Sequence, residues 1–148
     1  MKVKESNQKG FTLIELMVVI VILGLLAGIL MPKFLGRTEE ARRTKATVQI
    51  RNIESALRLF KLDNGFYPST EQGLEALISE PTVGEIPKHW KEGGYMEKGR
   101  VPLDPWKNPF QYISPGINNF DYDLSSLGAD EEVGGEGRYA DINSWEIE

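Results

Sequence analysis

The sequence predicts an α+β fold, in which one long N-terminal helix packs against a small antiparallel sheet of about three strands. Three observations support this fold class. Residues 16–31 form an uninterrupted apolar run, a helical stripe of apolar side chains follows it, and short apolar segments bounded by turn residues occupy the C-terminal third. We divide the chain into four segments: a basic leader at 1–10, a transmembrane helix at 11–32, an amphipathic continuation of that helix at 33–65, and a globular head at 66–148.

The apolar run is long enough to cross a lipid bilayer. Counted from Phe11 to Met31, it holds twenty-one residues and is interrupted only by Thr12 and Glu15. A helix of this length spans about 30 Å, the thickness of the hydrocarbon core. We therefore predict a single-pass anchor, for which a retained secretory signal anchor is the plain interpretation. Lysines and arginines lie on both sides of the run, so a count of positive charges does not fix its orientation.

Residues 10–15, with the sequence Gly-Phe-Thr-Leu-Ile-Glu, follow a short leader that contains three lysines. This segment resembles the cleavage motif of the type IV pilins and their relatives. The resemblance implies that a prepilin peptidase cuts between Gly10 and Phe11 and methylates the new N-terminal residue, Phe11. It also implies that Glu15 is the acid that serves filament assembly in this family.

Glu15 lies close to the start of the apolar run, where a carboxylate is costly. An ionised side chain in a membrane helix costs about 2.5–3.5 kcal/mol at the centre of the bilayer and less near its edge. Such a residue needs a partner, and Lys9 would be lost on cleavage. The α-amino group that cleavage creates on Phe11 of a neighbouring subunit is the partner we predict. Buried ion pairs specify register better than they add stability, so we assign Glu15 to the register between subunits.

The helix is expected to continue beyond the apolar run on one face only. Apolar residues recur there with spacings of 4, 3, 4 and 3, at Ala46, Ile50, Ile53, Leu57 and Phe60. Asn64 and Gly65 then supply a C-terminal stop, because glycine suits the left-handed cap. A coiled coil is the alternative, but the stripe is short, so we predict that it seats the globular head.

The head is expected to contain one short helix and about three strands. Ser69 and Gln72 form a capping-box pattern ahead of an apolar helix face, and residues 79–109 form an ordered loop that contains Trp90 and Trp106. Residues 110–113 are typical of a strand. Alternation of apolar and polar residues over 120–125 predicts a second strand, and residues 142–145 predict a third.

Composition excludes several classes of chemistry. The chain has no cysteine, so it offers neither a disulfide framework nor a thiol nucleophile. His89 is the only histidine, and no catalytic signature surrounds it. No basic surface with interleaved aromatic residues indicates nucleic-acid binding. We therefore predict that the protein is not an enzyme and has no nucleic-acid partner.

Residues 127–141 combine five acids with four glycines. A flexible, solvated acidic loop is the plain interpretation. The alternative is a calcium site, because Ca²⁺ prefers six to eight hard oxygen ligands from carboxylates and backbone carbonyls, and glycines let carbonyls point inward. The spacing of Asp130, Glu131 and Glu132 is not that of an EF-hand loop.

A closer resemblance covers nearly the whole chain. Its motifs lie at residues 70–74, 93–95, 104–106, 114–116, 126–130, 134–135 and 140–142, with Trp145. In order and spacing they resemble the major pseudopilins of type II secretion systems. The resemblance implies Ca²⁺ binding by the backbone carbonyl of Leu127 and the side chains of Asp130 and Asp141, with further oxygens from residues 133–139. Glu131 stands where this family usually has glycine.

The resemblance implies a structural function. The subunits would polymerise into a periplasmic pseudopilus that drives folded proteins across the outer membrane. Before assembly the protein would lie in the inner membrane, with its N-terminus cytoplasmic and its head periplasmic. The implied partners are other copies of the chain, minor pseudopilins, inner-membrane assembly proteins and the prepilin peptidase. A surface or competence pilin is the main alternative, although such pilins usually close a C-terminal loop with a disulfide. An anchored binding protein, in which Glu15 is dispensable, is a third.

Overall fold

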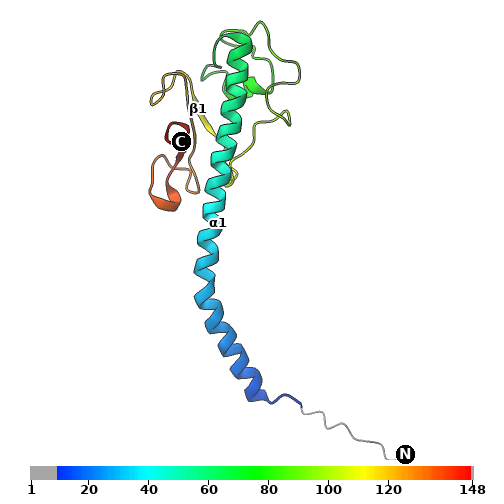
Figure 1. Ribbon diagram of the computed structural model, residues 1–148, viewed down its shortest axis with the longest axis vertical. Coiled ribbons are helices and arrows are strands. Elements are labelled where there is room, and N and C mark those ends of the chain that lie inside the picture. Colours follow the sequence, from blue (N-terminus) through cyan, green and yellow to red (C-terminus); the bar gives the residue numbers. More distant parts are fainter. Residues whose placement is uncertain (1–9, 148) are drawn as a thin grey trace, which may run out of the picture. The chain divides into compact units, whose positions relative to one another are not determined.

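The computed structural model describes residues 10–147, except for the side chains of residues 29–36. The elements, labelled in Figure 1, are α1 (Leu13–Asn64), η1 (Leu74–Leu77), β1 (Gln111–Ile113), β2 (Asp123–Ser126), η2 (Gly137–Tyr139), β3 (Ile142–Asn143) and η3 (Ser144–Glu146). The chain forms two compact units, one that extends to Thr38 and one that begins at Glu39. The second unit, which we call the head unit, contains the C-terminal part of α1 and all other elements.

The described part of the N-terminal unit consists of residues 10–12 and the first part of α1. Its apolar side chains are exposed, with Phe11 at 80% and Ile14 at 71%. In the part of the chain that the structure describes, no helix combines the length and apolarity needed to cross a membrane. The transmembrane segment at 11–32 therefore stays a prediction. The leader, apart from Gly10, lies outside the described residues.

The amphipathic continuation of the helix is confirmed. α1 is a single helix of 52 residues, and all five members of the predicted apolar stripe are fully buried in the head unit. The helix ends at Asn64, as predicted. Gly65 follows in the left-handed conformation, and its N–H donates to the carbonyl of Lys61 at 2.7 Å. The stripe is therefore the helix's contribution to the hydrophobic core of the head. Because it is already buried there, it is not free to form a coiled coil with another helix.

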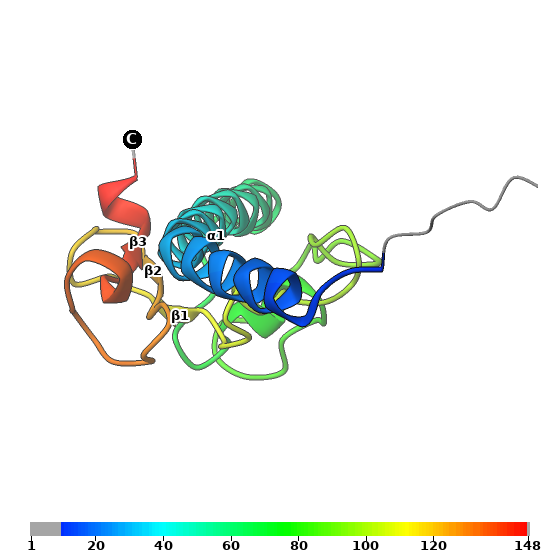
Figure 2. The same cartoon turned by 90° about the horizontal axis from the view of Figure 1, so that it is seen from below.

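The predicted antiparallel sheet of three strands is confirmed, with strand order β1-β2-β3. Gln111 of β1 is opposite Ser125 of β2, and Ser126 of β2 is opposite Ile142 of β3. Figure 2 shows the sheet beside α1. Tyr112 and Leu124 point into the core that the sheet and helix enclose.

Two strand boundaries differ from the prediction. β2 begins at Asp123 rather than at residue 120, and Phe120 is 92% exposed instead of buried. The reason is a turn over residues 114–119, whose backbone N–H groups donate to the carboxylate of Asp123. Because of this turn, the pairing of β2 with β1 begins only at Asp123. β3 ends at Asn143, because Ser144 begins the short helix η3.

The segment before the sheet is ordered, as predicted. Ser69 and Gln72 form a reciprocal capping box, with N–H to side-chain distances of 3.1 and 3.2 Å. The helix that follows is the 3₁₀ helix η1. Gly73, at φ +60°, turns the chain before it. Within residues 79–109, the indole N–H of Trp90 donates to the carbonyl of Ala76 at 2.9 Å and anchors that loop on η1.

The turn before β2 is held by the buried carboxylate of Asp123. Its oxygens accept backbone N–H groups from Ile117, Asn118 and Asn119 at 2.8–2.9 Å. Burial alone would raise the pKa of Asp123, but these hydrogen bonds outweigh it and lower the pKa below its usual value. The folded state therefore binds the proton more weakly than the unfolded chain, so Asp123 contributes stability above about pH 4 that is lost as the pH falls through the folded-state pKa.

We expect Asp123→Asn to lower the free energy of unfolding at pH 7 by about 1–3 kcal/mol, because an amide NH₂ cannot accept the turn's N–H groups. The loss should begin to shrink below about pH 4, because the unfolded chain takes up the proton there, and it should be smallest once the pH falls through the lowered pKa of folded Asp123. Urea denaturation between pH 7 and pH 3 measures both effects. Asp121→Asn is the matched control, since its carboxylate is partly exposed and only meets Lys61 at 3.5 Å. Parallel stability curves for wild type and Asp123→Asn would contradict the assignment.

Candidate functional site

The start of α1 brings together the residues predicted for processing and assembly. Thr12 is the N-cap of the helix. Its backbone N–H and its hydroxyl both donate to Oε2 of Glu15 at 3.2 Å, and the hydroxyl accepts the N–H of Glu15 at 3.3 Å. This is a capping box, in which the first and fourth residues satisfy each other's orphan groups. Glu15 therefore has a partner within its own chain, which the sequence prediction missed.

The signal for this cap is present in the sequence. Thr12 and Glu15 have the same Thr/Ser-x-x-Glu/Gln pattern that predicted the capping box at Ser69 and Gln72. The cap has a consequence for the cost of the carboxylate in an apolar environment. Two donors already satisfy Oε2, and a helix N-terminus favours negative charge. No described residue donates to Oε1, so the carboxylate keeps an oxygen for a second donor.

The predicted cleavage site lies directly before the cap. Gly10 and Phe11 precede the helix and are exposed, and the nearest helical hydrogen bond is the one from Leu16 N–H to the carbonyl of Thr12 at 3.3 Å. A peptidase can reach an exposed bond ahead of the helix without unwinding it. After cleavage the new α-amino group would lie one residue from the N-cap, four positions before Glu15.

In the C-terminal loop, residues 127–141, the last residue is joined to the middle of the loop. The N–H of Asp141 donates to the carbonyl of Gly134 at 3.1 Å, and the N–H of Gly134 donates to Oδ2 of Asp141 at 2.9 Å. Gly128 adopts φ +69°, and a Cβ there would lie 3.5 Å from the carbonyl oxygen of Ala140. The segment that contains Leu127 therefore lies beside the segment that ends in Asp141, as a shared ligand set requires.

One oxygen at this junction lacks a protein partner. Oδ1 of Asp141 is buried and receives no hydrogen bond from any described residue. An unsatisfied buried oxygen costs about 1–3 kcal/mol, and more when it carries charge. Such an atom fits a site that a cation completes. Asp130 is exposed, and its Oδ1 accepts only the N–H of Glu132, at 3.4 Å.

Glu131 keeps the backbone that glycine would adopt. It has φ +61°, which is uncommon for a residue with a side chain. This left-handed backbone is one that glycine adopts readily, which agrees with the glycine that the family resemblance implies at this position. The described residues contain no group of three or more His, Cys, Asp or Glu side chains that could hold a metal. The predicted calcium ligands include only two carboxylates, and the remaining ligands would be carbonyl oxygens, which such a group does not count. The calcium site therefore stays a prediction.

A buried network fixes the start of the loop. Asp104 accepts the N–H groups of Trp106 and Asn108 at 2.9 and 2.8 Å through Oδ1, and the hydroxyl of Ser126 at 2.6 Å through Oδ2. The side-chain amide of Asn108 donates to the carbonyl of Gly128 at 3.1 Å. The turn at 104–109, within the segment predicted as an ordered loop, thus supports the loop that carries the candidate ligands.

The end of the loop is fixed by the helix. The guanidinium of Arg43, on α1, donates to the backbone carbonyl of Ala140 and, at 3.4 Å, to that of Asp141. These contacts join residues 97 and 98 positions apart in the chain. No local sequence pattern indicates them. Arg43 is therefore a positioning residue for the loop that sequence reasoning could not find.

Comparison with known proteins covers nearly the whole chain. Residues 33–145 match the family described as type II secretion system (T2SS), protein G, and residues 6–31 match the prokaryotic N-terminal methylation motif. The type II secretion system core protein G of Pseudomonas aeruginosa is 49% identical over 143 residues, which are 97% of this chain and 99% of the relative. That of Vibrio cholerae is 50% identical over 145 residues, which are 98% of this chain and 97% of the relative.

A solved structure agrees with these relatives. The crystal structure of the major pseudopilin from the type 2 secretion system of enterohaemorrhagic Escherichia coli superposes with a TM-score of 0.65 at 39% identity. The alignment covers 75% of this chain and 92% of the crystallised one. The fold of the described head is therefore that of a known pilin-like subunit.

Proposed function

This chain belongs to the type II secretion system protein G family, and from that premise we propose how it is processed, anchored and assembled. It is a major pseudopilin, a structural subunit of the periplasmic pseudopilus through which such a system exports folded proteins. The observation that carries this conclusion is the identity of about half of all positions over nearly the full length of two relatives. The family is a structural one, and the surface-pilin alternative is not favoured by these matches.

The first proposed step is processing. A prepilin peptidase cuts between Gly10 and Phe11 and methylates Phe11. The match of residues 6–31 to the N-terminal methylation motif supports this step, as does the exposure of Gly10 and Phe11 ahead of the capped helix.

The second proposed step is storage in the inner membrane. Residues 11–32 cross the bilayer, with the leader in the cytoplasm and the head in the periplasm. The apolar run supports this assignment, and the capping box lowers the cost of the one carboxylate within it, because Thr12 supplies two hydrogen bonds to Glu15. The anchor would become the core of the filament when subunits leave the lipid.

The third proposed step is polymerisation with a defined register. The free Oε1 of Glu15 accepts the N-terminal amine of Phe11 from a neighbouring subunit. A contact between two different surfaces of identical chains extends into a helical filament when its rotation does not close a ring. Minor pseudopilins and inner-membrane assembly proteins are the further partners that membership of this system implies.

A bound calcium ion is the fourth element of the proposal. The carbonyl of Leu127 and the side chains of Asp130 and Asp141 would hold it, with oxygens from residues 133–139. Ca²⁺ would supply the positive charge that the buried Oδ1 of Asp141 lacks and would order the loop. Because the ion binds the folded head, it would stabilise that head by mass action.

Mass spectrometry of the mature chain tests the processing step. The expected N-terminal residue is Phe11 carrying one added methyl group. Gly10→Val is the matched control, since a branched side chain at the cleaved bond should leave the chain at its full length. A wild-type chain that begins at Met1, or at any residue other than Phe11, would refute the proposed processing.

A further inference from the structure

A groove of about 810 Å³ lies in the head unit between α1 and the segment 95–103. One wall is a stripe of α1 that recurs every three or four residues, formed by Lys45, Gln49, Asn52, Ala56 and Leu59. The other wall is the segment that ends at Leu103. The amide of Gln49 donates to the carbonyl of Leu103 at 2.8 Å and holds the two walls together. Leu59 and Leu103 are about half exposed, so the groove offers apolar surface to an occupant.

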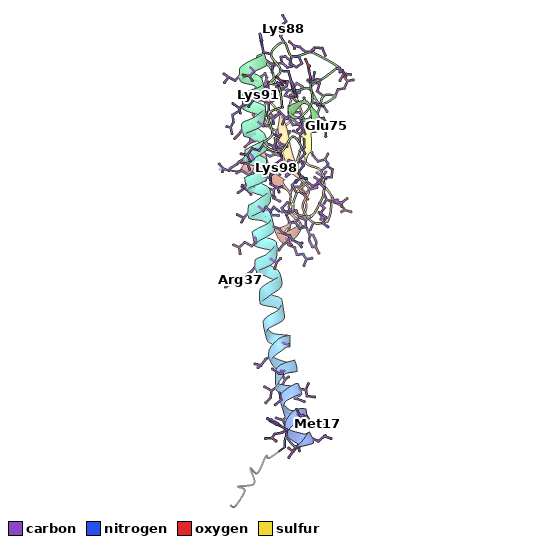
Figure 3. The ribbon with its side chains drawn as sticks, turned by 90° about the vertical axis from the view of Figure 1, so that its right-hand side faces the viewer. Met17, Arg37, Glu75, Lys88, Lys91 and Lys98 are labelled. Atoms are coloured by element: carbon purple, nitrogen blue, oxygen red, sulfur yellow. The ribbon has the colours of Figure 1, made fainter. Side chains whose placement is uncertain are left out.

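The rim of this groove is positively charged. Lys45, Lys98 and Arg100 line it and are exposed, and Glu97 is the one acid among the lining residues. None of the three cations forms an ion pair with a described residue. Figure 3 labels Lys98 alongside α1. The groove therefore suits an apolar side chain flanked by carboxylates.

The C-terminal loop presents that pattern. Val133 is 87% exposed, and Glu131, Glu132 and Glu136 flank it. These three acids are exposed and unpaired among the described residues. The nearby cation Arg138 lies over the ring of Tyr139 at 4.6 Å. Glu131 and Glu132 lie outside the predicted calcium ligands, whereas Glu136 lies in the segment 133–139 that would supply further oxygens.

The two surfaces cannot meet within one chain. In Figures 1 and 2 the C-terminal loop, orange to red, lies on one side of α1, and the yellow-green segment 95–103 lies on the other. We propose that the groove receives the loop of a second copy, with Val133 between its apolar walls and Glu131 and Glu132 against the basic rim. Opposite charges that face each other across such a contact select the partner and its register.

This proposal rests on the pseudopilus function and adds to it. The contact joins two different surfaces of identical chains, so it propagates in one direction, as a filament requires. The head contact would fix the register between neighbouring subunits a second time, separately from the ion pair of Glu15 at the start of α1. Order in the C-terminal loop would then favour assembly directly, since a fixed loop loses less conformational freedom on docking.

The absence of cysteine makes a direct test possible. Two full-length single variants, Arg100→Cys and Glu132→Cys, are produced in the same cells together with the secretion system. Under mild oxidation they should form a disulfide-linked dimer that contains one copy of each. Each variant alone should not. Lys88→Cys paired with Glu132→Cys is the matched control, because Lys88 is an exposed lysine of the same head that does not line the groove. We expect at least a tenfold excess of cross-linked dimer over this control.

Charge exchange provides the second arm. Arg100→Glu should reduce filament yield, and adding Glu132→Arg in the same chain should restore it. Filaments that form without the cross-link, or a cross-link in Glu132→Cys alone, would overturn the proposed contact and leave the pseudopilus function intact. If the unmodified chain forms no filament in this system, the proposed function fails, and the head contact fails with it.

Discussion

Glu15→Ala is expected to abolish filament assembly while the chain still enters the membrane. Removing one member of a buried ion pair leaves the other charge uncompensated, which costs about 3–5 kcal/mol. That cost corresponds to a loss of more than a hundredfold in an assembly equilibrium. Insertion should not suffer, because the substitution removes a carboxylate from an apolar run. Membrane fractionation measures insertion, and electron microscopy with quantification of sheared filaments measures assembly.

Because Glu15 also takes part in the capping box of α1, the experiment needs a control variant that disturbs only the cap. Glu15 both caps its own helix and, in our proposal, receives a neighbour's amine, and alanine removes both interactions. Thr12→Val separates them, because it removes the hydroxyl that bonds Glu15 and keeps the carboxylate. Loss of an N-cap costs about 0.5–2 kcal/mol, so Thr12→Val should reduce assembly much less. Equal defects in the two variants would assign Glu15 to the cap, and normal filaments from Glu15→Ala would reject the register.

Features encoded by local periodicity could be predicted from the sequence. The buried stripe of α1 was predicted residue by residue, because a helix places positions three and four apart on one face. The end of the helix at Asn64 followed from glycine at residue 65. The strands followed from short apolar segments near turn residues, with alternation for the second strand only. The error at Phe120 has a different origin. Alternation places Phe120 in a strand, but the turn's hydrogen bonds to Asp123 keep it outside the sheet.

Of the two candidate sites, one is indicated by a local motif in the sequence and the other depends on long-range contacts. The residues predicted for processing and assembly, Gly10, Phe11 and Glu15, lie together in one short segment, so a local motif that resembles a known family is enough to indicate them. The C-terminal loop depends on contacts that join distant parts of the chain. Arg43 reaches Ala140 from α1, and Asp104 bonds Ser126 across 22 positions. Such pairs leave no periodic signal, and only the folded chain brings them together.

Removing calcium is expected to lower the melting temperature of the head by about 10 °C or more. Saturation at one hundred times the dissociation constant stabilises a folded protein by about 2.7 kcal/mol. Each kcal/mol shifts the melting temperature of a domain of about 100 residues by about 4 °C or more. A fragment that begins at Glu39, the start of the compact head unit, suits the measurement. Its melting curve is compared in Ca²⁺ and in a chelator.

Asp141→Asn tests whether the loop is the origin of that shift. The amide oxygen of asparagine can still accept the N–H of Gly134, so this contact within the loop survives while the charge is lost. The calcium-dependent shift should therefore disappear, and the melting temperature in chelator should change little. Glu132→Gln is the control, because it removes one acid of the loop that is not a predicted ligand and should keep the full shift. If Asp141→Asn and wild type respond equally to Ca²⁺, the ion binds elsewhere. If neither responds, residues 127–141 form a solvated acidic loop, and the docking of that loop on a second copy must depend on its own hydrogen bonds for order.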